Sequence, residues 1–496
     1  MNKIRTIITQ DAEVDDQNSL RHFLFYANEV DLQGIVQTSS KFHWEGVPGA
    51  VKPDRKRSEH EFAGEESGPF DQPYRWPGTE WMFRVISDYA ADYPNLIKHA
   101  DGYPTPEYLR SITKVGNIGY EGETEVSTEG SDLIKKHILD DDPRTLYLQV
   151  WGGTNTIVRA LMDIEAEFKD SPEWPGLRAG IMKKVVITAC GEQDPTYRSY
   201  IAEAWPDILF VKTLQMRSYA YPWFVMPEGE SKDTLKADFM QREITNGKSR
   251  LTDGYCTWLD GHRYLGEGEI GQFGTNTNIT KEWFGAKMGM PEPVPHDFLS
   301  EGDSPTFFPL FDWGFRTLED FSYGGIAGRY CKVSDQFNSK GEPLNVWDVA
   351  MDGYTGRDGK TVSTESMWPY VADIQRDFAA RVDWAAADRY EDAEHQPELV
   401  IEGGPDLTVK AGETVPLKAK ASCPDSGLHA SVCFRIYEEP GAEWSGRAVL
   451  RSDGPSAEVS IPAEAVPGDR LHIIVKAQCD GHHRLTHYQH VIVTID

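Results

Sequence analysis

The 496-residue chain carries 50 Lys and Arg against 79 Asp and Glu, a formal net charge of −29 at pH 7. This charge repels phosphate backbones and anionic lipid, and no basic patch stands out, so we expect neither a nucleic-acid nor a membrane partner. No apolar run reaches the roughly 18 residues that cross a bilayer, and the length favours two or more domains.

The cysteines and the N-terminus bear on the compartment. The six cysteines lack the paired spacing of a zinc site, so we expect reduced, mostly buried thiols. The start, MNKIRTIITQ, has no apolar signal-peptide core, which predicts a cytoplasmic protein as written and a secreted or periplasmic one if a leader was trimmed. The sequence does not decide whether the protein forms a homo-oligomer.

Short β-branched runs alternate with helical patterns over the first 300 residues. The runs are RTIIT (5–9), TLYLQV (145–150), KKVVITA (183–189) and DILFVKT (207–213). Such alternation predicts an α/β domain with a mostly parallel, Rossmann-like sheet covered by helices on both faces. In these sheets ligands bind at the carboxyl ends of the strands.

The second half of the chain changes in texture. Residues 215–365, including DGYCTWLDGHRYLGEGEIGQFGTNTN (253–278), are rich in Gly, Trp and Tyr and predict long loops around a site rather than another sheet. DIQRDFAARVDWAAADRYEDAEHQP (373–397) predicts a closing helix ended by Gln396-Pro397. Alternating short strands beyond it predict a β-sandwich of about 100 residues. The predicted domains are therefore 1–396 and 397–496.

The first predicted strand is followed directly by four acids, Asp11, Glu13, Asp15 and Asp16. Asp15 or Asp16 at the N-terminus of the next helix would explain one or two of them as caps. A third carboxylate at a buried strand end would repel the others and raise their pKa values, and a divalent cation such as Ca²⁺ removes that conflict. We favour metal binding over capping alone.

This stretch, QDAEVDD, resembles the DxDPGxDD signature of the Ca²⁺-dependent nucleoside hydrolases, with Thr9 in place of the first Asp and Ala12-Glu13 in place of Pro-Gly. The resemblance implies that Asp11 ligates calcium and also orients and deprotonates the attacking water. It further implies that Asp16 is the chelating ligand and that Asp15 holds sugar hydroxyls.

Two later segments extend the resemblance. YLQVWGGTNTIVRAL looks like the strand–turn–helix in which a backbone carbonyl, here that of Trp151, contacts the metal. Gly152 and Gly153 would let the chain approach closely, although a plain βα turn explains the two glycines equally well. SEGDSPTFF looks like the segment that supplies the last ligand, here Asp303. Gly302 stands where a histidine would help a nucleobase leave, so we expect little nucleoside hydrolysis.

A branch of that superfamily is closer still. The segments YPNLIKHADGYPTPEYLRSITKVGNIGYEG, WGGTNT, EGDSPTFF, DFAARVDW and PGDRLHIIVKAQCDGHHRLTHYQHVIVTI resemble nucleoside-hydrolase-like proteins with a C-terminal immunoglobulin-like domain, described as cellulose-binding proteins. The resemblance covers essentially the whole chain and implies a nucleoside-hydrolase-type sheet, an immunoglobulin-like sandwich and a carbohydrate or glycoside partner.

Cleavage at an anomeric carbon needs an activated water on one face and an acid at the leaving atom. Glu301 is the first candidate for that acid, with Glu123 and Glu192 behind it, and for each a solvated surface acid is the simpler interpretation. The sequence thus predicts a Ca²⁺-dependent hydrolase of O- or N-glycosides, furanosides included, that uses a calcium-bound water activated by Asp11. The alternative is a carbohydrate-binding protein without turnover.

Polar and aromatic residues at other strand ends are candidates for sugar recognition. Asn155 and Asp194 are the stronger ones, followed by Gln193, Lys41 and Trp44. The indoles of Trp44, Trp76 and Trp151 suit core or loop packing equally well. His43 fits a satisfied hydrogen-bonding residue better than a catalyst.

Overall fold

The computed structural model describes residues 3–52, 60–62, 64, 67–261 and 294–496. Its centre is a sheet with the strand order β3-β2-β1-β4-β5-β6-β8-β7, parallel except for the antiparallel β7–β8 pair. The strands are β1 Ile4–Gln10, β2 Val30–Gln37, β3 Thr113–Val115, β4 Leu146–Val150, β5 Val185–Ala189, β6 Leu209–Lys212, β7 Tyr330–Lys332 and β8 Val346–Val349. The predicted α/β class with a mostly parallel sheet is confirmed.

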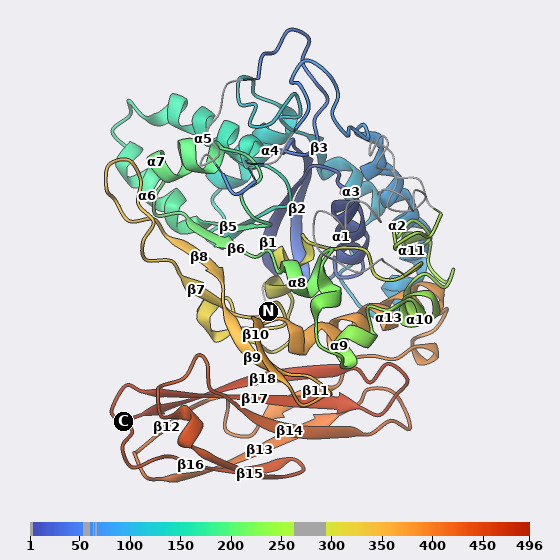
Figure 1. Cartoon of the computed structure of the whole chain (residues 1–496), viewed down its shortest axis with the longest axis vertical. Helices are drawn as coiled ribbons and strands as arrows, with labels where there is room; N and C mark the ends of the chain where they lie inside the picture. Colours follow the sequence, from blue (N-terminus) through green and yellow to red (C-terminus); the bar gives the residue numbers. More distant parts are fainter. Residues whose placement is uncertain (1–2, 53–59, 63, 65–66, 262–293) are drawn as a thin grey trace.

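Helices cover both faces of this sheet, because neighbouring strand residues point to opposite sides (Figure 1). Ile7 packs in one apolar cluster with residues of α4, α5 and α6. Ile8 packs in another with residues of α1, α2, α3 and α13. The helices are α1 Val14–Leu24, α2 Glu80–His99, α3 Pro106–Ile112, α4 Glu129–Leu139, α5 Asn155–Phe168, α6 Trp174–Lys184 and α13 Val371–Ala386.

The segment 215–365 contains more regular structure than the sequence predicts. The strands β7 and β8 extend the main sheet, and β9 Met351–Thr355 pairs with β10 Thr361–Glu365 in a separate hairpin. The expectation of loops alone is therefore wrong, because short strands are too brief to show a period. The described residues of this segment also form short helices, among them α8 Met216–Tyr219, α9 Glu230–Asp233, α10 Ala237–Phe239 and α11 Arg250–Asp253. Residues 262–278 of the Gly-rich segment lie outside the described residues.

The closing helix is shorter than predicted. It ends at Ala386, and Ala387 is extended, so the helix does not continue to Pro397. The linker that follows is anchored by side chains instead. Tyr390 stacks on His395 with ring centroids 3.7 Å apart, and His395 Nδ1 lies 2.7 Å from Asp425 Oδ1 in the C-terminal domain. The prediction of a helix over 387–397 is therefore wrong, because tertiary contacts decide the conformation of this stretch.

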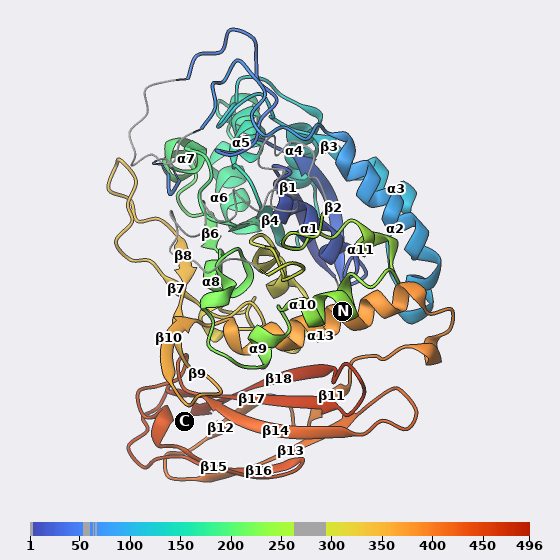
Figure 2. The same ribbon diagram turned by 45° about the vertical axis from the view of Figure 1, so that its right-hand side comes forward.

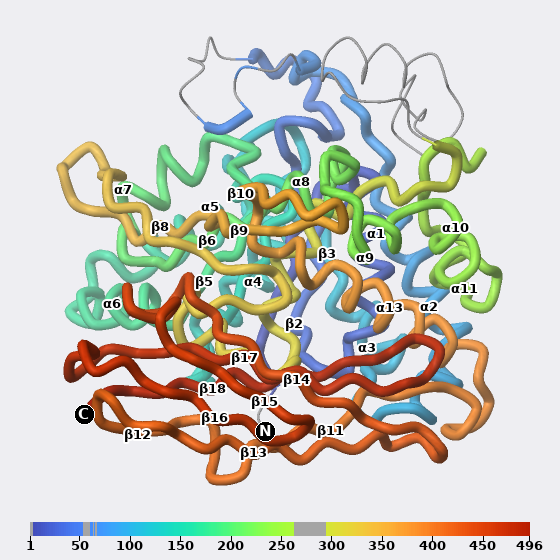
Figure 3. Tube along the Cα trace, turned by 60° about the horizontal axis from the view of Figure 1, so that its bottom comes forward, coloured from blue at the N-terminus to red at the C-terminus, as the bar shows by residue number. Residues whose placement is uncertain are grey.

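The C-terminal part is a sandwich of two sheets, with the orders β11-β13-β16-β15 and β12-β18-β17-β14 (Figure 3). All of its pairings are antiparallel except the parallel β12–β18 pair. The strands are β11 Glu398–Ile401, β12 Asp406–Val409, β13 Thr414–Ser422, β14 Ala430–Tyr437, β15 Val449–Asp453, β16 Ser456–Ser460, β17 Arg470–Cys479 and β18 Thr486–Ile495. Side chains of β13 alternate between buried and exposed, as one covered face requires.

One disulfide joins Cys423, just after β13, to Cys479 at the end of β17. The prediction of six reduced, mostly buried thiols is therefore wrong for this pair. It is also wrong for Cys331 and Cys433, which are free but exposed. The two bridged residues are 56 apart in the chain. Because β13 and β17 lie in different sheets, it is the packing of the two sheets that brings them together.

The sandwich packs directly on the α/β domain, with α13 and the β9–β10 hairpin along the boundary (Figures 1 and 2). Tyr437, Ile474 and Tyr488 of the sandwich belong to the same apolar cluster as the buried face of α13. Lys476 Nζ also pairs with Asp373 Oδ2 of α13 at 2.7 Å. The two domains therefore share a core.

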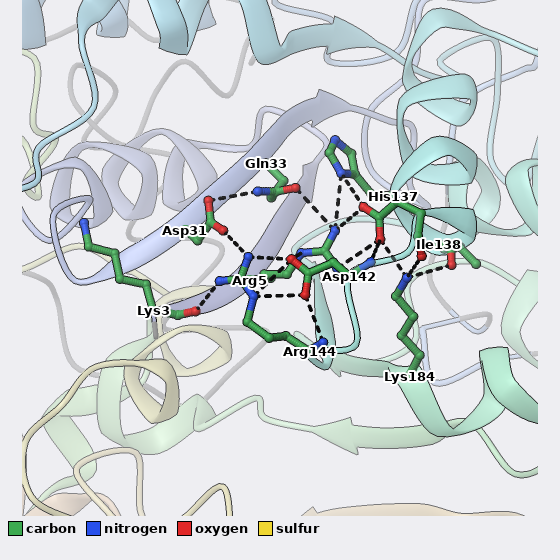
Figure 4. Close-up of polar contacts among 10 residues, drawn as sticks. Lys3, Arg5, Asp31, Gln33, His137, Ile138, Asp142, Arg144 and Lys184 are labelled. Atoms are coloured by element: carbon green, nitrogen blue, oxygen red, sulfur yellow. Dashed lines mark hydrogen bonds and ion pairs between the residues drawn. The ribbon is translucent and has the colours of Figure 1, made fainter. Parts of the chain in front are cut away.

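A network of charges closes the amino edge of the sheet (Figure 4). Arg5, which is 1% exposed, lies on β1 and pairs with Asp140 and Asp142. Lys184, just before β5, pairs with Asp140 at 2.8 Å. Burial raises the pKa of Asp140, but hydrogen bonds from Lys184 and Arg5 outweigh it, so that pKa is lowered. Opposite charges are thus matched at this edge.

Candidate functional site

The opposite edge holds the acidic cluster. Asp11 follows β1, and Gly152 follows β4, at the point where the strand order reverses direction, which is where parallel sheets bind ligands. A Cβ on Gly152 would lie 2.7 Å from Asp11 Cβ, and one on Gly153 would collide with the Asp194 carboxylate. The paired glycines therefore do more than make a turn. They admit β4 close to the acids, as predicted.

The backbone after β1 turns sharply to present the carboxylates. Ala12 has a φ of 73°, in the left-handed region that non-glycine residues rarely adopt. Helix α1 then starts at Val14, and its N-cap residue, Glu13, makes no capping hydrogen bond with its side chain. Asp15 and Asp16 lie in the first turn. Capping alone therefore does not explain the cluster.

Asp15, Asp16 and Asp303 converge, with one carboxylate oxygen of each within 4.8 Å of the others. Asp303 precedes the short 3₁₀ helix Ser304–Thr306, so residues nearly 290 positions apart meet. The three side chains are between 1% and 8% exposed. Asp11 adjoins them, because its backbone N–H donates to Asp16 Oδ1 at 3.0 Å.

Burial and mutual repulsion set the protonation of this cluster. Burial, together with the charge of Asp11, raises the pKa of Asp15 to about 7. Burial and the neighbouring carboxylates raise the pKa values of Asp16 and Asp303 well above the ordinary value. At neutral pH the three groups therefore compete to stay ionised unless a cation joins them.

The donor set fits a hard divalent cation. Three buried carboxylates offer only oxygen ligands, which Ca²⁺ prefers and can bind in flexible geometry. Among the described residues, neither Asp303 Oδ2 nor Asp11 Oδ2 has a hydrogen-bond partner, and buried polar atoms are rarely left in that state. Asp16 and Asp303, two of the predicted calcium ligands, lie together with Asp15. Asp11, the third predicted carboxylate ligand, adjoins them, and its own carboxylate groups with Glu13 and His43.

Asp11 has a second neighbour, His43. Its Nδ1 lies 3.6 Å from Asp11 Oδ2, and both side chains are 1% exposed. Burial raises the pKa of Asp11, but the neighbouring His43 side chain and its charge outweigh burial, so that pKa is lowered. From the sequence, His43 was expected to be a satisfied hydrogen-bonding residue rather than a catalyst. Asp11 is thus the one carboxylate of the cluster held in its ionised form.

The predicted general acid, Glu301, lies in a closed network. It is fully buried, and its Oε2 is 2.7 Å from His22 Nδ1 and accepts from Ser304 Oγ at 2.5 Å. Tyr255 donates to its other oxygen. Because both oxygens are engaged, we assign Glu301 to holding the Asp303 segment rather than to protonating a leaving group.

The glycine at position 302, between Glu301 and Asp303, is there for a steric reason. A Cβ there would lie 2.8 Å from Asp15 Oδ2 and 3.7 Å from Cys190 Sγ. A histidine at this position would displace the acidic cluster. Cys190 in turn donates to the Gly302 carbonyl at 3.3 Å. Cys190 and Ser300 were not predicted from the sequence to lie at this site, and the Ser300 hydroxyl donates to Asp15 Oδ2 at 3.3 Å. The signal for Cys190 was available, since it follows β5 directly.

The two stronger candidates for sugar recognition are committed elsewhere. Asn155 donates to Ser39 Oγ at 2.9 Å and to two backbone carbonyls, and its Oδ1 accepts from Thr38. Asp194 accepts from Thr196 and from the Asn155 backbone N–H at the start of α5. Both side chains are buried and hydrogen-bonded, so they shape the site without facing a ligand.

Most weaker candidates also have structural partners. Gln193 donates to the Trp151 carbonyl at 2.6 Å, the oxygen predicted to contact the metal. Trp44 is fully buried, packs on Tyr74 and donates to the carbonyls of Pro69 and Gln72. The Trp151 indole donates to Thr306. Lys41 is 3% exposed and donates its backbone N–H to Gln193, and Trp76 is half-buried.

The two reserve acids are not solvated either. Glu123 is buried and accepts from Asn117 Nδ2 at 3.0 Å. Glu192 is 2% exposed and pairs with Arg198. The interpretation of all three glutamates as surface acids is therefore wrong, because each is buried with a partner.

Comparison with known proteins gives the family. The model of a family described as "Cellulose-binding Sde182, nucleoside hydrolase-like domain" matches residues 5–330, more than half of the chain. The chain belongs to this family. A second model, "Cellulose-binding protein Sde0182, C-terminal domain", matches residues 414–495. The resemblance found in the sequence is thus confirmed for both parts.

One solved structure agrees with this fold over its whole length. A nucleoside hydrolase-related hypothetical protein from Saccharophagus degradans, associated with carbohydrate metabolism, is 24% identical with a TM-score of 0.70, covering 100% of both chains. The effector protein XOO4466 and the type III effector protein XopQ in complex with adenosine diphosphate ribose are each 11% identical, covering 78% of this chain and 95% of theirs. Their TM-scores of 0.35 carry no argument. No curated protein matches the chain.

None of the helices in the described ranges is both long and apolar enough to span a bilayer.

Proposed function

We propose that the protein is a Ca²⁺-dependent hydrolase of glycosidic bonds. The observation that carries this proposal is the convergence of Asp15, Asp16 and Asp303, buried and mutually repelling, beside an ionised Asp11 at the switch point of the sheet. A pure packing role gives no reason to bury four carboxylates together, whose uncompensated repulsion costs about 1.4 kcal/mol per pKa unit.

Each residue has a separate task in this proposal. Asp16 and Asp303 hold the cation, and Asp15 divides its oxygens between the cation and sugar hydroxyls. When bound, Ca²⁺ supplies positive charge that lowers the pKa of a nearby water. Asp11 takes the proton as general base, since it alone of the cluster has a lowered pKa. His43 orients the Asp11 carboxylate through Oδ2.

A carbohydrate-binding protein without turnover is the second candidate. Two observations favour it: the family description is cellulose-binding, and Glu301, Glu123 and Glu192 are all engaged by partners. Without a free general acid, only good leaving groups can depart without protonation, so only substrates that carry them would be cleaved. We therefore expect activated glycosides to be cleaved and nucleosides to be poor substrates.

The metal is tested first, by calorimetry with Ca²⁺ on chelator-treated protein. We expect one site, and Asp303→Asn should weaken it by at least about 100-fold, because even outer partners of metal ligands are worth about 10–100-fold. Glu173→Gln is the matched control, since Glu173 is an exposed acid without a capping bond. Equal affinity of wild type and Asp303→Asn would remove calcium from this cluster.

Turnover is tested with nitrophenyl glycosides, furanosides included, and with nucleosides, each with Ca²⁺ and with chelator. Asp11→Asn should lower kcat by about 10²–10⁴, the usual value of general base catalysis. If wild type cleaves none of the panel but binds cello-oligosaccharides in a calcium-dependent way, the binding function is correct instead.

We also propose that the protein folds in an oxidising compartment, since structural disulfides such as Cys423–Cys479 persist there and are rare in the cytosol. This replaces the cytoplasmic expectation. Fractionation of producing cells tests it, and a cytosolic protein with reduced Cys423 and Cys479 would contradict it.

A further inference from the structure

A groove of about 630 Å³ runs between the two domains, and none of its lining residues belongs to the acidic cluster. Its α/β wall comes from α9, α10 and the segment up to Glu243, with Arg376 of α13. The sandwich contributes His482, His483 and Arg484, from the turn between β17 and β18. The groove is thus formed by both domains together.

Three donors converge in this groove. Glu243 is 4% exposed and lies in the π-helix Met240–Ile244, a rare form that recurs at functional sites. His482 Nε2 lies 3.2 and 3.3 Å from the two Glu243 oxygens. One donor atom each of Glu243, His482 and His483 lies within 4.8 Å of the other two. The imidazoles come from one domain and the carboxylate from the other.

The turn that carries the histidines is held in a fixed shape. Glu394 of the linker accepts the backbone N–H of His482 at 2.5 Å and that of His483 at 2.9 Å. A Cβ on Gly481 would lie 2.6 Å from the Glu394 carboxylate, so only glycine lets it dock. Arg484 ends the turn with a φ of 52°. Such strain persists where surrounding contacts enforce it.

The buried histidine has the support that metal ligands usually have. His483 Nε2 lies 2.9 Å from Asp383 Oδ2, and Asp383 is paired with Lys248 at 2.6 Å. A carboxylate on one ring nitrogen fixes the tautomer and leaves the other nitrogen, here Nδ1, with its lone pair. The side chain of His483 is 4% exposed, whereas that of His482 is 64% exposed and free to adjust.

We propose that Glu243, His482 and His483 bind a divalent transition-metal cation of the Zn²⁺ type that bridges the domains. Two imidazoles and one carboxylate suit such ions and not Ca²⁺, which takes oxygen ligands. Bonds of about 2.0–2.1 Å in a tetrahedron place donors about 3.3 Å apart. The observed 4.8 Å limit therefore requires only a small closure, mostly by the exposed His482.

One competitor must move. Arg242 Nε donates to Glu243 Oε1 at 2.6 Å, but its side chain is 61% exposed. Because the guanidinium is exposed, solvent screens this pair, and the side chain can turn into water when a cation binds. Three protein donors leave a fourth position open to the groove, for water or for a donor atom of a ligand.

The test is calorimetry with Zn²⁺ alone on full-length protein without a histidine tag, in saturating Ca²⁺ to occupy the acidic cluster. We expect one Zn²⁺ per chain, and His482→Ala should weaken it by at least about 10-fold. Since His482 is exposed, this variant should fold. His429→Ala is the matched control, because His429 is 84% exposed on the same domain.

Electron paramagnetic resonance of bound Cu²⁺ separates this site from any carboxylate site. Wild type and His429→Ala should show nitrogen couplings, and His482→Ala should lose part of them. No Zn²⁺ binding by wild type, equal Zn²⁺ affinity in His482→Ala, or Cu²⁺ without nitrogen couplings would each overturn the proposal.

Discussion

Acid should loosen the sandwich through a buried histidine pair. His472 on β17 and His490 on β18 are each 1% exposed, and His472 Nδ1 lies 2.9 Å from His490 Nε2. Their rings face Tyr323 of the α/β domain, with centroids 4.9 and 5.9 Å away. Burial first, and then nearby charges that include Arg316, lower the pKa of His472 to about 4 and that of His490 to about 3.

The sign follows from these lowered values. The folded protein binds fewer protons than the unfolded chain below pH 6.5, so this stabilisation is complete above pH 6.5 and is lost as the pH falls toward 4. The pKa of His472 is about 4 in the folded protein, against an ordinary value of 6.5. At about 1.4 kcal/mol per pKa unit, such a histidine contributes about 2.5 kcal/mol less to the free energy of unfolding at pH 4.5 than at pH 7.5. The two values are coupled, so we do not add them.

The assay compares wild type with His472→Gln/His490→Gln, which keeps polar side chains that cannot be protonated. Hydrogen exchange of the β17 and β18 amides gives the opening free energy at each pH. Between pH 7.5 and 4.5, wild type should lose at least about 2.5 kcal/mol more than the double variant. His429→Gln, at an 84% exposed site, should behave as wild type. Identical pH profiles for wild type and the double variant would refute the reasoning.

Three further predictions test other parts of the structure. Gly302→Ala should weaken Ca²⁺ binding at least about 10-fold without removing a ligand, because the new Cβ would lie 2.8 Å from Asp15 Oδ2. The control Gly180→Ala places its Cβ in open space on α6 and should instead stabilise the folded protein by about 0.5–1 kcal/mol. Equal calcium affinity in the two variants would contradict this prediction. Thiol titration of unreduced, denatured protein should find Cys190, Cys256, Cys331 and Cys433 and miss Cys423 and Cys479, whereas six thiols would exclude the disulfide. Deleting 397–496 should make the remainder aggregate by exposing the surface that Ile474 and Tyr488 cover, and a soluble remainder with unchanged stability would show that the cores are separate.

The sequence predicted the parts of the site that depend on local pattern. A β-branched run followed by acids placed Asp11 at a strand end, and the family resemblance connected Asp16 to Asp303 across nearly 290 residues. The glycines after β4 were predicted to permit close approach, and they do. The placement of Asp11 needed only strand direction and residue type, whereas Asp303 and the role of the glycines came from the family resemblance.

The sequence could not show which polar side chains of the site already have hydrogen-bond partners. Asn155 and Asp194 lie at strand ends as predicted, but their partners come from turns that follow β2, β3 and β5. Glu301 has the right residue type for an acid, yet His22 of α1 and Tyr255 enclose it. Which polar groups remain free depends on contacts between distant segments, and no spacing in the sequence encodes them.

The two edges of the sheet treat charge in opposite ways, and this difference supports a cation at the acidic one. At the amino edge, Asp140 and Asp142 are matched by Arg5, Arg144 and Lys184 (Figure 4). At the carboxyl edge, no Lys or Arg among the described residues forms an ion pair with the four aspartates, and His43 alone approaches Asp11. The fold thus neutralises carboxylates with Arg and Lys at one edge of the sheet and not at the other. Leaving the carboxylates without them keeps their oxygens for a ligand whose charge comes from outside the chain.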